Sequence, residues 1–228
     1  MSGKTVVIAG ASGGVGSAIA SALYHGTDAN LILIGRNPDR MAALPDEGLK
    51  FVGDLNNEAL LGSVATTINQ SYGTLHGLIL SVGIYEQSNS PEILNQQLTA
   101  NVIGPYALLR AVAPALIAGE GTVIFINSSQ AIRASAAVGQ YAATMHAMKA
   151  IADSFRDEIN DQNVRVTTLY LGRTAGERQR KLFALEGRDY PPERLIQPAD
   201  VASIVLNVLN LPKTAEITDL HIRPALKT

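Results

Sequence analysis

Short apolar runs alternate along the chain with longer stretches in which apolar residues recur every three or four positions. The short runs are rich in β-branched residues, and several are apolar at successive positions, which is typical of strands buried on both faces of a parallel sheet. We expect strands at residues 5–9, 31–34, 49–52, 75–82, 122–127, 164–171 and 217–222. The longer stretches predict helices at residues 15–24, 57–72, 91–118, 139–162 and 198–210. This alternation predicts a doubly wound α/β fold, with helices on both faces of a parallel sheet.

The length and the lack of linkers predict one domain over residues 1–228. The chain has 228 residues, of which 46% are hydrophobic and 17% charged, and it shows no internal repeat. The least regular segment, residues 172–197, predicts a mobile lid over a ligand. It is rich in arginine, with Arg173, Arg178, Arg180 and Arg188. These arginines either lie on a solvated helix face, which we favour, or meet an anionic substrate.

Charge and cysteine usage exclude several classes of function. A formal net charge of -2 argues against nucleic acid or an anionic membrane as the main partner. The absence of cysteine excludes disulfides and thiolate metal sites. The four histidines are scattered, and no nucleophile elbow of the Gly-x-Ser-x-Gly type follows a central strand. Without a signal segment or an apolar run of about 18 residues, we expect a soluble, cytoplasmic protein.

A glycine-rich loop follows the first expected strand in "AGASGGVGSAIASAL". Gly10, Gly14 and Gly16 allow a tight turn and a close approach of backbone N–H groups and a helix N-terminus to a pyrophosphate. The spacing is G-x-x-x-G-x-G, not G-x-G-x-x-G. The alternative is a merely tight strand-to-helix turn, but the position between an N-terminal strand and an amphipathic helix favours dinucleotide binding.

The ends of the second and third expected strands bear on the choice of cofactor. An acid at the end of the second strand would bind a ribose 2'-hydroxyl, whereas here Gly35 fills that position and Arg36 follows it. Arginine can neutralise a 2'-phosphate, so we favour NADP(H) over NAD(H), the alternative being a solvated charge. Asp54 either accepts a hydrogen bond from the adenine amino group or caps the helix that begins near Asn56.

The combined motifs resemble the short-chain dehydrogenase/reductase family over nearly the whole chain. "AGASGGVG" is similar to the cofactor loop, "GDL" to the adenine pocket, and "SVG" to the family's Asn-Ala-Gly element. "NVIG", "INSS" and "YAATM" place Asn101, Ser128 and Tyr141 at three of the four active-site positions, with Ser129 as an alternative to Ser128. The resemblance implies a seven-stranded Rossmann-type sheet, a homodimer or homotetramer, and hydride transfer between NAD(P)H and a small carbonyl or alcohol substrate.

The resemblance also implies roles for individual residues. Tyr141 would exchange a proton with the substrate oxygen, Ser128 would polarise that oxygen, and Asn101 would anchor a water of the proton relay. The implied cofactor-binding residues are Gly10, Ser12, Gly13, Gly14, Val15, Gly16, Arg36, Asp54, Leu55, Ser81, Val82, Gly83, Gly172 and Thr174. We expect Tyr141 to be exposed in the first turn of its helix.

The sequence departs from the family pattern around the nicotinamide. Met145 stands where the family has a lysine that binds the nicotinamide ribose and favours the ionised tyrosine, and Leu171 and Gly176 replace the usual proline and threonine. Helix geometry places Lys149 too far along the helix and His146 too far around it to replace that lysine. Two hypotheses remain: an NADPH-dependent carbonyl reductase, which the three retained positions favour, and a non-catalytic NADP-binding sensor, regulator or complex partner.

Overall fold

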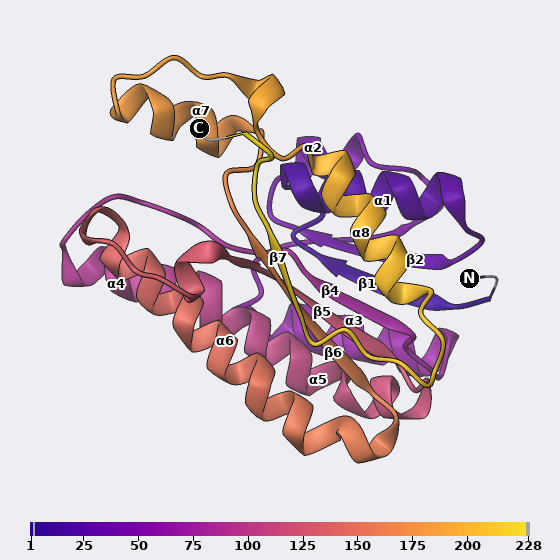
Figure 1. Cartoon of the computed structure of the whole chain (residues 1–228). Helices are drawn as coiled ribbons and strands as arrows, with labels where there is room; N and C mark the ends of the chain where they lie inside the picture. Colours follow the sequence, from indigo (N-terminus) through magenta and orange to yellow (C-terminus); the bar gives the residue numbers. More distant parts are fainter. Residues whose placement is uncertain (2, 227–228) are drawn as a thin grey trace.

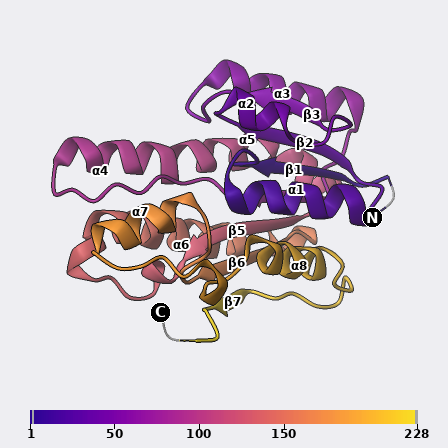
Figure 2. The same cartoon turned by 90° about the horizontal axis from the view of Figure 1, so that it is seen from above.

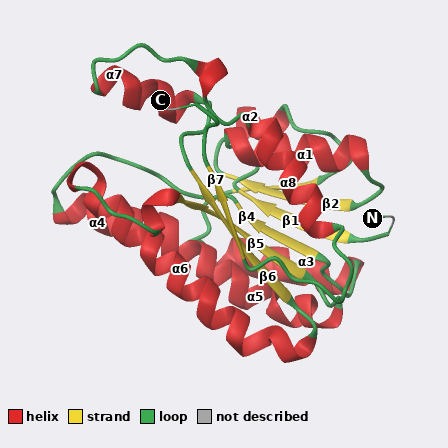
Figure 3. Ribbon diagram, viewed as in Figure 1, coloured by secondary structure: helices red, strands yellow, loops and turns green. Residues whose placement is uncertain are grey.

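A single seven-stranded parallel sheet forms the centre of the molecule in the computed structural model, which describes residues 1 and 3–226 (Figures 1 and 3). The strands are β1 Thr5–Ala9, β2 Asn30–Gly35, β3 Leu49–Val52, β4 Gly77–Leu80, β5 Thr122–Ser128, β6 Arg165–Leu171 and β7 Asp219–Ile222. Their order is β3-β2-β1-β4-β5-β6-β7, and every neighbouring pair is parallel. The chain reverses its direction of winding between β1 and β4, where doubly wound folds bind ligands at the carboxyl edge of the sheet. The predicted fold class is confirmed.

Helices cover both faces of the sheet, as the continuous apolar runs require (Figure 2). One face is covered by α1 Gly14–Gly26, the short α2 Pro38–Ala42 and α8 Pro198–Leu209. The other face is covered by α3 Glu58–Ser71, α5 Gly104–Ala118 and α6 Gly139–Ile159. Strands β1, β4 and β6 are buried at every position, which explains why their apolar residues do not alternate.

The helix expected at 91–118 contains a turn that its periodicity did not predict. It consists of α4 Pro91–Leu98, a π-helical turn at Thr99–Ile103, and α5. A π turn inserts an extra residue into the helix and often lies at a functional site. The whole segment of 28 residues is long and apolar enough to cross a membrane by length and composition alone, and 50% of its most apolar window is buried. Packing of α5 against the sheet accounts for this apolar character.

The segment expected to form a lid contains a helix, α7 Glu177–Leu185, which the sequence did not predict (Figure 1). Phe183 is the only buried residue of α7, and it is fully buried. The guanidinium carbons of Arg173 and Arg188 lie 4.6 and 5.0 Å from the centre of its ring, and Tyr190 meets it edge to face. The segment thus folds around one aromatic side chain, with polar residues on its other faces.

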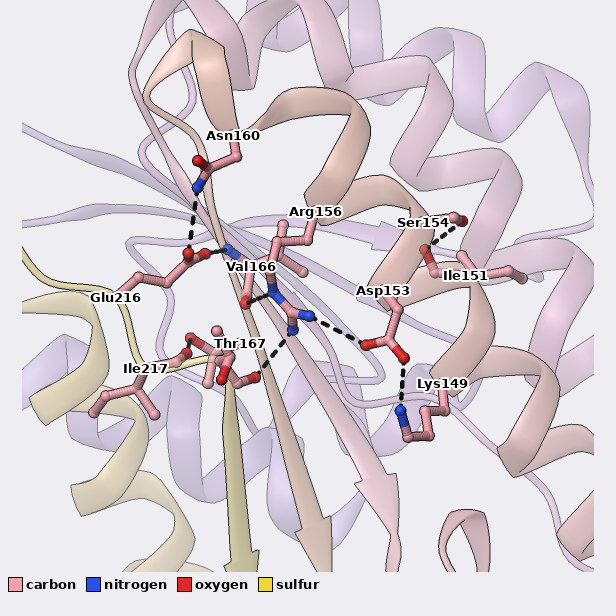
Figure 4. Close-up of polar contacts among 11 residues, drawn as sticks. Lys149, Ile151, Asp153, Ser154, Arg156, Asn160, Val166, Thr167, Glu216 and Ile217 are labelled. Atoms are coloured by element: carbon pink, nitrogen blue, oxygen red, sulfur yellow. Dashed lines mark hydrogen bonds and ion pairs between the residues drawn. The ribbon is translucent and has the colours of Figure 1, made fainter.

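A polar network fixes the second half of α6 to the sheet (Figure 4). The Arg156 side chain donates hydrogen bonds of 3.0 Å to the main-chain carbonyls of Val166 and Thr218, and one of 3.1 Å to Asp153. Lys149 Nζ lies 2.6 Å from the same carboxyl group. Burial raises the pKa of Asp153, but the hydrogen bonds and charges of these two cations outweigh that effect and hold the pKa below its ordinary value. The network anchors the helix that carries Tyr141.

Candidate functional site

Two cavities lie at the carboxyl edge of the sheet. The first, of about 250 Å³, includes residues of the glycine-rich loop, of the ends of β2 and β3, and of the segment after β4. The second, of about 240 Å³, lies between residues 85–89 and residues 136–141. Ile84 lines the first cavity and Tyr85 the second, so one short stretch of backbone separates them. Expected site residues that line the first cavity are Gly10, Ser12, Gly13, Arg36, Asp54, Leu55, Ser81, Val82 and Gly83. Tyr141 lines the second.

The glycine-rich loop has the geometry of an anion cradle. Gly10 has a φ of 85°, and a Cβ on it would lie 2.2 Å from the Ser81 carbonyl oxygen. A Cβ on Gly16 would lie 2.2 Å from the Gly10 carbonyl oxygen, so this glycine allows the loop and α1 to pack closely. The N-terminus of α1 has no side-chain cap at Gly13, which leaves its first N–H groups available to an anion. The residues present therefore fit the pyrophosphate of a dinucleotide.

Gly35, at the end of β2, is enclosed by side chains. A Cβ at this position would lie 2.5 Å from Met41 Sδ and 2.7 Å from Ser12 Oγ. The carboxylate that would recognise a ribose 2'-hydroxyl therefore has no room at Gly35 unless both Met41 and Ser12 move. The sequence shows glycine instead of an acid at this position, and the structure gives a steric reason for the glycine.

Two arginines lie beside Gly35, of which the sequence analysis identified only one. Arg36 Nη1 lies 3.7 Å from Asp54 Oδ2, and both side chains are about half exposed. Arg40 lines the same cavity from α2, and its Nη2 lies 2.9 Å from Glu177 Oε2, in the first turn of α7. Exposed pairs of this kind are weak, so both guanidinium groups can exchange their carboxylate for a phosphate. Arg40 follows Asn37 and Pro38, a typical helix start, so a short helix that returns it to the end of β2 could have been expected from the sequence.

Asp54 does not cap α3, which was one of its two expected roles. The cap of α3 is Asn57, whose Oδ1 accepts from the N–H groups of Ala59 and Leu60. Asp54 instead accepts hydrogen bonds from the backbone and side chain of Asn56, at 3.0 and 2.6 Å. These bonds hold its carboxyl group at the wall of the first cavity, where the other expected role remains open to it.

Asn101 lies in the π-helical turn and is 1% exposed. Its Oδ1 accepts from the Ile84 N–H at 2.6 Å, and its Nδ2 donates to the Ile84 carbonyl and to Thr144 Oγ1, both at 3.0 Å. Both amide protons are therefore used within the protein. The side chain thus holds the backbone between the two cavities against α6. Because neither amide proton is free, a water bound at Asn101 must donate its hydrogen bond to an oxygen atom of this residue.

Ser128 ends β5 beside α6. Its Oγ accepts from the Gln130 N–H at 3.2 Å, which leaves the hydroxyl proton free to donate. The preceding Asn127, which the sequence analysis did not single out, donates from Nδ2 to the Met145 carbonyl at 3.1 Å and accepts from the Ser128 N–H at 2.7 Å. Asn127 therefore fixes the end of β5 relative to the turn of α6 that carries Met145.

Tyr141 is buried rather than exposed, with 9% of its surface accessible. Tyr85 meets it edge to face, with ring centres 5.2 Å apart, and Met145 and Tyr170 belong to the same apolar cluster. The expectation failed because Tyr85 comes from the segment after β4, which periodicity within α6 cannot indicate. Burial, with the charge of Glu186, raises the pKa of Tyr85, so this neighbour stays a neutral phenol near pH 7.

Lys149 and His146, the two residues weighed as substitutes for the family's lysine, both have partners on their own helix. The ammonium of Lys149 pairs with Asp153 at 2.6 Å, and Nδ1 of His146 lies 2.9 Å from the Ala142 carbonyl oxygen of its own helix. Met145 is 5% exposed and packs in the cluster around Tyr141. Residues 1 and 3–226 contain no group of three or more histidine or acidic side chains that could hold a metal ion.

The remaining expected cofactor residues lie outside the lining of both cavities. Gly14 and Val15 begin α1, while Gly172 and Thr174 follow β6. Thr174 donates from Oγ1 to the Gly172 carbonyl at 3.2 Å and pairs with Ile196 in an isolated bridge, which closes the base of the lid.

Comparison with known proteins identifies the family. The family described as short chain dehydrogenase matches residues 4–186. The chain is 31% identical over 187 residues to dehydrogenase/reductase SDR family member 7B of Danio rerio, covering 74% of this chain and 60% of that protein. It is 27% identical over 235 residues to an uncharacterized oxidoreductase of Staphylococcus aureus (strain N315), covering 97% of each chain. The chain thus spans about three fifths of the length of the zebrafish relative.

Solved structures agree with this result. The crystal structure of a metagenomic short-chain oxidoreductase in complex with NADP superposes with a TM-score of 0.81 and 26% identity, covering 99% of both chains. An alcohol dehydrogenase from the archaeon Thermococcus sibiricus, complexed with 5-hydroxy-NADP, gives a TM-score of 0.83 at 23% identity, covering 99% of this chain and 98% of the other. By its sequence and its fold, the chain belongs to the short-chain dehydrogenase family of oxidoreductases.

Proposed function

We propose that the protein is an NADPH-dependent reductase of a small carbonyl substrate. The observation that carries the proposal is the enclosed Gly35 flanked by Arg36 and Arg40 at the wall of the first cavity, which favours a 2'-phosphate over a 2'-hydroxyl. The NADP complex of the metagenomic relative supports the same cofactor. The glycine loop and the N-terminus of α1 would bind the pyrophosphate, with Asp54, Leu55 and residues 81–83 around the rest of the cofactor.

The second cavity is the proposed substrate site. The cofactor, when bound, supplies a hydride for the carbonyl carbon. Tyr141 lines this cavity and would transfer its phenolic proton to the carbonyl oxygen as charge develops. Ser128 does not line the cavity, but its hydroxyl proton is free, and it would donate a hydrogen bond to the same oxygen once the substrate reaches the end of β5. Asn101 positions the backbone between the cavities. The lid of residues 172–197 would exclude water over the cofactor and substrate.

Met145 favours a second candidate, a non-catalytic NADP-binding sensor, regulator or complex partner. A buried thioether in contact with the cluster around Tyr141 provides no positive charge to the phenol or to a ribose. We place this function second because the amides of Asn101 and Asn127 hold the Tyr141 turn of α6 against the end of β5 and the loop after β4. These bonds keep Tyr141 close to the end of β5 and to the loop after β4, as a shared active site would require.

The test is NADPH consumption against a broad panel of carbonyl compounds, with NADPH affinity measured by fluorescence titration on the same sample. Tight NADPH binding with turnover of any carbonyl supports the reductase. Tight binding without turnover supports the second candidate. Failure to bind either NADPH or NADH contradicts both.

We also propose a cytoplasmic homodimer or homotetramer. The exposed side of the segment around α5 carries Ile103, Tyr106 and Ile117, which are 55%, 44% and 36% accessible. A symmetric partner would cover such a surface. A concentration-independent monomer in light scattering at micromolar protein would contradict this proposal.

A further inference from the structure

The first turn of α7 contacts both parts of the site. Glu177, its first residue, pairs with Arg40 at the wall of the first cavity, at 2.9 Å. The next residue, Arg178, does not line the second cavity itself, but its side chain lies over the ring of Tyr141, which does. Its guanidinium carbon lies 6.0 Å from the centre of the Tyr141 ring. Two adjacent residues of the lid therefore reach the proposed phosphate end of the cofactor and the proposed proton donor.

The charge of Arg178 is not neutralised by a neighbouring carboxylate. Within residues 1 and 3–226, the Arg178 side chain makes no ion pair, and it lies over the ring of Tyr141. Other arginines of the same segment differ, because Arg173 and Arg188 both pair with Glu186. A guanidinium stays protonated at any pH at which the protein is folded. Arg178 thus carries a full positive charge beside Tyr141.

The helix that holds Tyr141 supplies no such charge. Met145 replaces the lysine of the family, and Lys149 is committed to Asp153. We propose that Arg178 acts on Tyr141 from the lid and supplies the positive charge that α6 lacks at Met145. This inference rests on the proposed reductase function. Arg178 is a positioning residue, since it acts through Tyr141 rather than on the substrate.

The magnitude of the effect follows from the separation. The 6.0 Å is measured to the centre of the ring. A unit charge at about that distance from a phenol displaces its ionisation by about half a pH unit in water-like surroundings at low salt, and by less as salt screens an exposed cation. A cation on a lid differs from a lysine on α6 because its effect exists only while the lid is closed. The exposed Arg40–Glu177 pair links the first turn of α7 to α2, and it would be exchanged if Arg40 binds a phosphate. Reactivity of Tyr141 would therefore depend on the position of the lid.

The test is the ultraviolet absorbance of tyrosinate as pH is raised, measured on the protein without cofactor. The difference between the native protein and Tyr141→Phe isolates the contribution of Tyr141. We expect Arg178→Gln to move this contribution to higher pH by about half a unit at low ionic strength, and by less as salt is added. Arg178→Lys should restore it in part because the charge returns. Arg180→Gln is the matched control, since Arg180 lies on the same helix but faces the Tyr190 ring at 5.1 Å.

An unchanged titration in Arg178→Gln, or an equal shift in Arg180→Gln, overturns the inference. A second measurement uses turnover: Arg178→Gln should move the pH profile of carbonyl reduction to more alkaline values while NADPH affinity stays within about twofold. If the native protein reduces no carbonyl, the proposed function fails, but the tyrosinate titration still decides whether Arg178 acts on Tyr141. Circular dichroism would check that the variants fold. Because Arg178 is exposed, we expect its substitution to leave the fold intact.

Discussion

The side-chain nitrogen of Asn127 donates a hydrogen bond of 3.1 Å to the main-chain carbonyl of Met145. The bond joins the end of β5 to α6 through backbone atoms of residue 145, and it does not involve the thioether. Position 145 is therefore held in place whatever its side chain is, and the side chain can be changed while the backbone around Tyr141 stays fixed. The first prediction uses this separation.

Met145→Lys should increase reductase turnover at least tenfold, equivalent to about 1.4 kcal/mol of barrier. Lysine has nearly the length of methionine, and its apolar stem can pack in the cluster while its ammonium reaches the phenol and the cofactor ribose. We also expect a less alkaline pH optimum. Steady-state NADPH oxidation across a pH series measures both effects.

Met145→Leu is the control for this substitution, because it changes shape without adding charge. Its turnover should stay within a few-fold of the native value. If Met145→Lys folds and binds NADPH yet reduces no compound of the carbonyl panel, the reductase proposal fails and the binding protein becomes the better account.

Arg36→Asp should weaken NADPH binding by about 1.5–3 kcal/mol, the scale of a charge-assisted hydrogen bond. The side chain is 58% exposed and only loosely paired with Asp54, so its loss should not disturb the fold. NADH binding should change little, which makes NADH the internal control. Isothermal titration of both cofactors gives the comparison, and equal affinity of the native protein for NADPH and NADH would contradict the proposed preference.

Arg156→Gln should lower the free energy of unfolding by about 2 kcal/mol. The Arg156 side chain is 16% exposed, and it bonds two main-chain carbonyls as well as Asp153. Arg110→Gln is the matched control. Arg110 pairs with Glu158 at the surface, so this change should cost less than about 0.5 kcal/mol. Urea unfolding compares the two, and similar losses would show that the Arg156 network adds no more than a surface pair.

His76 should make the protein less stable as the pH falls. Its Nδ1 accepts a hydrogen bond of 3.1 Å from the Thr5 N–H, which requires the neutral ring. Burial lowers the pKa of His76, and the charges of Lys4 and Lys213 lower it further. Above about pH 6.5 the ring is neutral in both states and contributes no pH dependence. As the pH falls below that value, the unfolded chain binds a proton more readily than the folded chain, so stability falls until the pH passes the folded-state pKa.

Urea unfolding between about pH 7.5 and 5 measures this dependence. His76→Gln keeps an acceptor for Thr5 but does not titrate, so its stability should vary less over the same range. His25→Gln is the control because the His25 ring is exposed. A slope that is the same in the native protein and in His76→Gln would assign the acid sensitivity to other groups.

Local sequence patterns predicted the sheet because each strand is a short apolar run that can be recognised by itself. Thr5–Ala9 and Leu49–Val52 have the bounds expected of them, and the glycine loop forms the expected turn into α1. The helix α7 was missed because its first five residues are polar and its apolar residues, Leu182 to Leu185, are consecutive, which leaves no periodic apolar face. The π turn was missed because one inserted residue disturbs a 3.6-residue period too little to be recognised.

The sequence predicted those residues of the candidate site that belong to a recognisable local motif. It did not predict contacts between residues from distant segments. The sequence pointed to Tyr141 and Arg36 but not to Tyr85, which lies 56 residues before Tyr141. Arg178 was named only as one of four arginines of the lid, and its contact with Tyr141, 37 residues before it, was not expected. The amide of Asn101 was expected to face a water. Its actual partners, at Ile84 and Thr144, depend on how three segments pack together.

The enclosure of Gly35 limits how this protein could be re-engineered. Replacing that glycine by aspartate alone, the direct route to an NAD-specific enzyme, would force the new Cβ against Met41 Sδ and Ser12 Oγ. Any larger residue at position 35 must therefore displace the side chains of Met41 and Ser12, and Ser12 lines the same cavity. The effect of an acid at this position would thus depend on how far α2 and the glycine-rich loop can adjust around it.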